Sequence, residues 1–207
     1  MTGLYKADTI KTKYIPKEEQ DMKNIFAVLR KNTLLMNITA VLAAVIASLL
    51  LPQLFHALGI LSGIGSSAGE MFLPMHIPVL IAGFCFGPAV GTAAGILSPL
   101  VSFMISGMPG AAVLPFIVIE LTVYGLLSGL LSKVKLNSFL KLLIVQVAGR
   151  IARLASVAIA ISFFGNTAFT YGTMALFITA GVFGVLIQWL IIPMVVGYIG
   201  GTEKSNE

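Results

Sequence analysis

The amino-acid sequence predicts an all-α polytopic membrane protein with six transmembrane helices and both termini in the cytoplasm. Hydrophobic residues make up 57% of the 207 residues, charged residues only 10%, and the mean hydropathy is +0.99. In a soluble globular protein, roughly a quarter of all residues are charged. Because so few charges cannot cover an aqueous surface, most of the surface is expected to face lipid.

The first apolar segment, 33–55, is long enough for one span, since a bilayer-crossing helix needs about 20 apolar residues. Residues 1–32 before it are polar and lack the apolar core and cleavage site of a signal peptide. We therefore predict a cytoplasmic N-terminal tail, followed by the first helix.

The next apolar stretch, 71–106, is too long for a single span. A Gly-Pro step at Gly87-Pro88 interrupts it, and proline suits the first turn of a new helix. Two helices are predicted, at 75–86 and 88–106.

Three further apolar segments complete the transmembrane domain. They predict helices at about 112–132, 139–164 and 174–199. The predicted organisation is a cytoplasmic tail at 1–32, a transmembrane substrate-binding domain at 33–199 and a cytoplasmic C-terminal tail at 200–207.

The distribution of basic residues gives an independent test of this count. The loops at 56–73, 106–111 and 165–173 contain no Lys or Arg, whereas seven of the thirteen basic residues precede residue 32 and three lie at 133–141. Cytoplasmic loops carry the excess of Lys and Arg. Six spans place every basic loop inside, and an odd number would not.

Three ionisable residues stand out deep inside the predicted spans: Glu120, Arg150 and Arg153. Such residues are costly in lipid and usually face a cavity or one another. Arg150 and Arg153 share a helix face, and Glu120 matches the depth of Arg153. Two interpretations stay open: both arginines pair with Glu120 and backbone carbonyls, or one holds an anionic substrate group. We favour Arg153 for the second role because it lies nearer the outer side.

Other candidate ligand contacts gather on the predicted outer side. Met75 and His76 lie between two prolines in an irregular entry to the second helix, and Met108 lies in a Gly-Met-Pro-Gly loop. Non-helical backbone at membrane depth survives when it lines a cavity or is buried in protein. His76 can donate to a ligand or simply bond a neighbouring carbonyl; Tyr124 is a contact or a packing residue.

The first helix carries small residues at four-residue spacing, namely Ala40, Ala43, Ala44 and Ala47. Small residues at this spacing let another helix approach closely. Taken alone, the pattern is better explained by packing within this chain. Gly91 and Gly95 in the third helix have the same spacing and predict close packing there.

Several functions lack the motifs that they need. The sequence has no phosphate-binding Gly-Lys-Ser/Thr loop for ATP, no His-Glu-x-x-His metal motif and no nucleophile elbow. No folded basic surface for nucleic acid is possible, and Cys85 is alone. We predict that the chain is not an enzyme and has no metal and no cofactor of its own.

Residues 33–199 resemble the substrate-binding (S) subunit of energy-coupling factor (ECF) vitamin transporters. The resemblance rests on the six-helix layout, the first-helix alanines and the run LPMHIPVLIAGFCFGPAVG at 73–91. It implies a multi-pass protein of a prokaryotic cell membrane that takes up a small water-soluble vitamin. It also implies that the alanines dock on a transmembrane coupling subunit, while two partner ATPase subunits hydrolyse ATP.

Within this family, the segments 75–78, 107–109 and 120–125 look most like the pantothenate-type branch. Riboflavin, niacin, cobalamin precursors and queuosine precursors remain open as substrates. The competing class is a free-standing secondary transporter or channel for a small organic anion. Such proteins usually show internal repeats and several intramembrane carboxylates, whereas Glu120 is the single one here.

Overall fold

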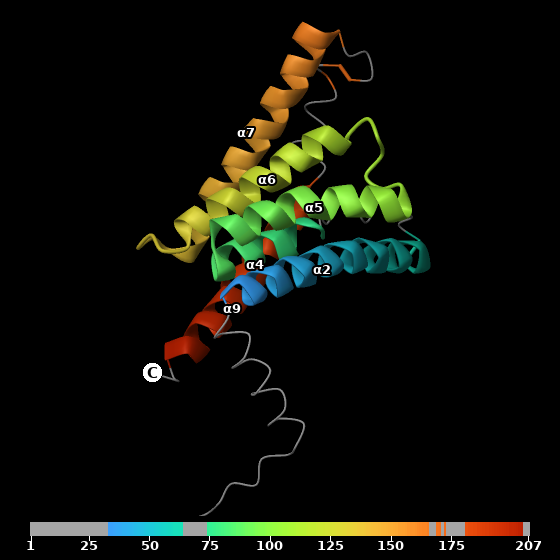
Figure 1. The fold of residues 1–207 in the computed structure, drawn as a ribbon. Helices are drawn as coiled ribbons and strands as arrows, with labels where there is room; N and C mark the ends of the chain where they lie inside the picture. The colour runs from blue at the N-terminus through green and yellow to red at the C-terminus, as the bar shows by residue number, and fades with distance from the viewer. Residues whose placement is uncertain (1–32, 64–73, 166–168, 171, 173–180, 205–207) are drawn as a thin grey trace, which may run out of the picture. The chain divides into compact units, whose positions relative to one another are not determined.

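The computed structural model describes residues 33–63, 74–165, 169–170, 172 and 181–204. In the last of these ranges, side chains are described only as far as Tyr198. These residues form six helices and no strand (Figure 1). The helices are α2 (Thr33–Leu61), α4 (His76–Phe86), α5 (Pro88–Ser106), α6 (Leu114–Leu131), α7 (Ser138–Phe164) and α9 (Val182–Lys204). The chain divides into two compact units, Met1–Met36 and Asn37–Glu207, and the helix packing described below belongs to the second.

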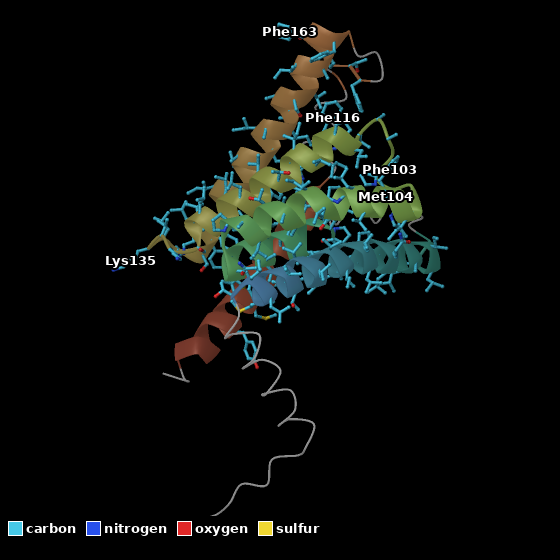
Figure 2. All side chains as sticks on the ribbon, viewed as in Figure 1. Phe103, Met104, Phe116, Lys135 and Phe163 are labelled. Atoms are coloured by element: carbon cyan, nitrogen blue, oxygen red, sulfur yellow. The ribbon has the colours of Figure 1, made fainter. Side chains whose placement is uncertain are left out.

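Four of these helices, α2, α5, α6 and α7, are long and apolar enough to cross a membrane. Helix α4 and the apolar part of α9, Val182–Tyr198, are shorter. Large apolar side chains such as Met104 and Phe163 project from the helices and are exposed (Figure 2). An apolar outer surface is expected of helices that face lipid.

The helix boundaries differ from the sequence predictions at several ends. Helix α2 continues past residue 55 to Leu61, because residues 56–61 are compatible with a helix and the turn comes only at Ser62-Gly63. Helix α9 continues past residue 199 to Lys204. The predicted sixth-helix residues 174–180 and the predicted tail 1–32 lie outside the described residues.

The break between α4 and α5 is confirmed at Gly87. This residue has φ 93°, a conformation that glycine adopts without steric penalty, and its N–H bonds to the Gly83 carbonyl. Pro88 then opens α5, where its missing N–H has no helical partner to lose.

Helices α5 and α6 pack most closely, and α4 packs against both. Glycines allow this approach: a Cβ on Gly91 would meet the Gly125 carbonyl, and one on Gly95 would meet the Leu121 carbonyl. The predicted role of Gly91 and Gly95 in close packing is therefore confirmed. The result is a tightly packed three-helix group on which the polar residues of α4 and α6 have fixed positions.

Candidate functional site

Glu120 is the centre of a buried cluster of charged side chains. Its carboxylate is 0% exposed on α6 and accepts a hydrogen bond from Arg153 Nη1 at 3.0 Å. Arg150 Nε lies 3.4 Å from the other carboxylate oxygen. Both arginines come from α7, which packs against α6, so the predicted match in depth between Glu120 and Arg153 is confirmed.

Both arginines, and not only one of them, contact the Glu120 carboxylate. Residues three apart on a helix share a face, so Arg150 and Arg153 reach the two oxygens of Glu120 from neighbouring turns. Arg153 has the shorter contact and the more buried side chain. The cluster can hold an anion, since guanidinium groups bind carboxylates through a planar fork of N–H donors.

His76 completes the cluster from the start of α4. Its Nε2 lies 3.8 Å from a Glu120 oxygen, and the side chain is nearly inaccessible to solvent. Neither ring nitrogen has a hydrogen-bond partner among the described residues. The preceding residue, Met75, is partly buried, and its backbone carbonyl accepts a bond from Ser48 Oγ at 3.3 Å. A buried imidazole whose ring nitrogens lack a hydrogen bond is able to serve a ligand.

Tyr124 connects this cluster to a second polar group. It is buried one turn after Glu120, and its ring packs edge-on to the His76 ring with centroids 5.3 Å apart. Gly149 on α7 leaves room for the tyrosine ring, because a Cβ there would overlap the ring atoms. The hydroxyl donates to the Gln146 carbonyl at 3.4 Å.

The second polar group was not predicted from the sequence. Gln146 on α7 and Gln188 on α9 are buried and joined by a hydrogen bond of 2.9 Å, and Trp189 Nε1 donates to Gln146 at 2.6 Å. The signal was present, because uncharged amides inside apolar segments need partners as charges do. A prediction from the ionisable residues of the spans alone overlooks them.

Met108 does not join the cluster in the described structure. It lies between α5 and α6 with 42% of its surface exposed, and its N–H donates to Ser106 Oγ at 3.4 Å. Its inclusion among the candidate contacts rested on the Gly-Met-Pro-Gly loop and on the resemblance of segment 107–109 to the pantothenate-type branch. A loop motif predicts available backbone groups, whereas side-chain position depends on packing that the motif does not encode.

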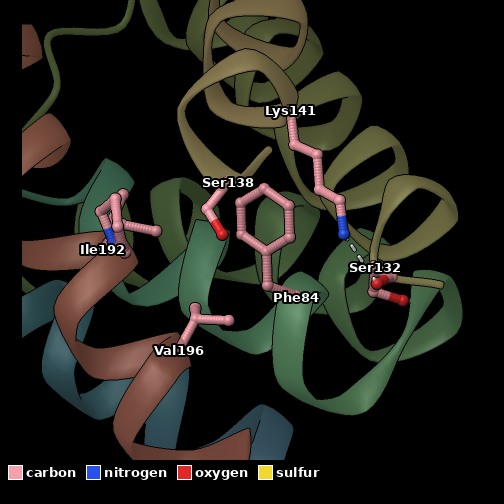
Figure 3. Close-up of a pocket in the computed structure, with 7 residues that line it drawn as sticks. Phe84, Ser132, Ser138, Lys141, Ile192 and Val196 are labelled. Atoms are coloured by element: carbon pink, nitrogen blue, oxygen red, sulfur yellow. Dashed lines mark hydrogen bonds between the residues drawn. The ribbon is translucent and has the colours of Figure 1, made fainter. Parts of the chain in front are cut away.

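A small cavity lies elsewhere, between the end of α4, the start of α7 and the middle of α9 (Figure 3). Its volume is about 40 Å³, and none of the predicted site residues lines it. Lys141 Nζ, at its edge, donates to the Ser132 carbonyl at 3.1 Å. That contact satisfies a carbonyl at the end of α6, where cations are favoured. The cavity is too small for a vitamin.

The four first-helix alanines differ in burial. Ala44 is buried and Ala40 partly buried against the core of this chain, whereas Ala43 is exposed and Ala47 is partly exposed. The Ala40–Ala44 pair is thus used in internal packing. Ala43 and Ala47 lie at the less buried edge of the same helix face, where their small side chains let another helix approach closely.

Within the described ranges, no group of three His, Cys, Asp or Glu residues could hold a metal ion. The two polar groups together contain one carboxylate, two guanidinium groups, an imidazole, a phenol and two amides.

The family model described as "ECF transporter, substrate-specific component" matches residues 33–201. The match spans nearly all of the six described helices. Comparison with curated proteins gave no match, and comparison with solved structures gave none either.

Proposed function

Because the chain belongs to the family of ECF transporter substrate-specific components, we propose that it captures pantothenate on the extracellular side of a prokaryotic plasma membrane. In this proposal all six helices cross the membrane and both termini are cytoplasmic. A transmembrane coupling subunit and two ATPase subunits then drive delivery to the cytoplasm. This chain contributes recognition of the substrate, and ATP hydrolysis belongs to its partners.

The observation that carries the substrate assignment is the buried cluster around Glu120. Two guanidinium groups and an imidazole converge on one carboxylate in an apolar domain. Such a group is suited to a small molecule with a carboxylate, and pantothenate has one carboxylate, two hydroxyls and an amide. A cationic substrate would instead require additional acidic side chains in the site.

Binding to the purified protein tests this proposal. We expect pantothenate to be retained through purification in detergent, to be identified by mass spectrometry, and to bind the emptied protein in isothermal titration. Partner subunits should co-purify from native membranes. A lone protein that transports an organic anion into liposomes would contradict the proposal and support the secondary-transporter class.

Ala43, which is exposed, and Ala47, which is partly exposed, are proposed as the docking surface for the coupling subunit. Replacing either by tryptophan should abolish uptake in cells but leave pantothenate affinity within about twofold, because added volume prevents close helix approach while the cluster around Glu120 keeps all its side chains. Leu42→Trp, at an exposed position on another face of the same helix, is the control and should preserve both. Equal loss of uptake and binding in the alanine variants would refute this assignment.

A further inference from the structure

The buried amides of α7 and α9 form a hydrogen-bonded row with one direction. Trp189 Nε1 donates to Gln146 Oε1, and Gln146 Nε2 donates to Gln188 Oε1. The indole N–H is a donor only, so it fixes the amide oxygen of Gln146 toward itself. The amide nitrogen of Gln146 must then face Gln188, which must present its oxygen in return.

This order of hydrogen bonds leaves the amide nitrogen of Gln188 at the end of the row. Gln188 Nε2 carries two N–H donors, and it has no hydrogen-bond partner among the described residues. The side chain is 1% exposed. Exchanging the amide oxygen and nitrogen would not satisfy it, because Gln146 Nε2 would then face a second donor. A buried donor that lacks an acceptor is destabilising, and native proteins seldom retain one without a reason.

The row lies directly beside the charged cluster. Gln146 precedes Arg150 by one helical turn on α7. Tyr124 contacts both groups, since its ring packs against His76 and its hydroxyl donates to the Gln146 carbonyl. A ligand anchored at the arginines and long enough to pass Tyr124 would therefore reach the amides.

We propose that Gln188 Nε2 donates a hydrogen bond to an uncharged acceptor oxygen of the substrate, a hydroxyl or an amide carbonyl. Gln146 and Trp189 act as positioning residues that hold the Gln188 amide in the donating orientation. This inference rests on the proposed function, because it assigns a second contact in the same binding site. It predicts that the substrate has a charged end and a neutral polar end.

The test compares binding of pantothenate and of its two monodeoxy analogues, each lacking one hydroxyl, to wild-type and variant proteins by isothermal titration. Gln188→Met keeps the length of the side chain and removes the donor. We expect it to weaken pantothenate binding about tenfold, the effect of one hydrogen bond. Trp189→Phe keeps an aromatic ring and frees the Gln146 amide, and it should weaken binding about threefold. Gln53→Met, an exposed substitution on α2, should change nothing.

The analogues separate substrate contact from a structural role. If a hydroxyl is the acceptor, its removal should weaken binding to the wild type but have little further effect in Gln188→Met. If the amide carbonyl is the acceptor, removing a hydroxyl should weaken binding by the same factor in the wild type and in Gln188→Met. Gln188→Met should still bind pantothenate more weakly than the wild type does. Unchanged pantothenate affinity in folded Gln188→Met would show that an ordered water satisfies the amide, and would overturn this inference alone.

Two further outcomes keep the result decisive. If Gln188→Met does not fold, Trp189→Phe carries the test, and unaltered affinity in that variant refutes the oriented donor. If the wild type does not bind pantothenate, the proposed function fails and this inference fails with it.

Discussion

Replacing Glu120 by alanine is expected to destabilise the folded protein by about 3–5 kcal/mol, the range for removing one partner of a buried ion pair. The carboxylate is fully buried and contacts both Arg150 and Arg153. Its removal leaves two guanidinium groups facing each other in an apolar domain without the charge that they both contact. Stability should therefore fall more than the affinity of each folded molecule for its substrate.

Denaturation in detergent micelles, followed by circular dichroism, measures this loss. Glu120→Asp keeps the charge on a shorter side chain and should be less destabilising. The double variant Glu120→Ala, Arg153→Met removes one charge of each sign, so it should be more stable than Glu120→Ala alone. If the two changes simply add, the ion pair does not stabilise the folded protein through its paired charges.

The course of the helices was largely predictable because its determinants are local. An apolar stretch of sufficient length must be helical in lipid, since every backbone group needs a partner within the segment. The Gly87-Pro88 step predicted the position of the break between α4, which ends at Phe86, and α5, which begins at Pro88. The end of α2 was less predictable, because residues 56–61 suit a helix as well as a loop.

The candidate site was predictable where it depends on charge. A buried Glu120 needs cations at the same depth, and counting residues along the predicted spans brings Arg153 to that depth. The orientation of the alanines was not predictable in the same way. Two overlapping pairs fit the same motif, and only packing distinguishes Ala44, which is buried, from Ala43, which is exposed.

The amides illustrate the limit of interpreting residues one at a time. Gln146 and Gln188 lie 42 positions apart, and neither has a motif around it. Their relation depends on how α7 and α9 rotate about their axes, which the packing against α4 and α6 determines. Their polarity within apolar spans indicates that each needs a partner, but it does not indicate that they pair with each other.

Arg153→Met is expected to weaken substrate binding by about 2–5 kcal/mol, the effect of truncating one member of a buried charge pair. Methionine keeps the apolar stem and removes the guanidinium. Arg153 lies nearer than Arg150 to the predicted outer side, and its bond to Glu120 at 3.0 Å fixes the plane of the group. A fork held in this way can bind Glu120 and a ligand carboxylate at the same time without losing further side-chain freedom.

Arg150→Met is the matched comparison, because it makes the same chemical change one turn away on α7. Its Nε is 3.4 Å from Glu120, and its side chain is more exposed, so we expect a smaller loss of affinity and of stability. Titration with pantothenate and with its alcohol analogue pantothenol separates the roles. An arginine that binds the carboxylate should lose affinity for pantothenate and little for pantothenol. Undiminished pantothenate affinity in both variants would leave the cluster as an ion pair that stabilises the helices, with the substrate bound elsewhere.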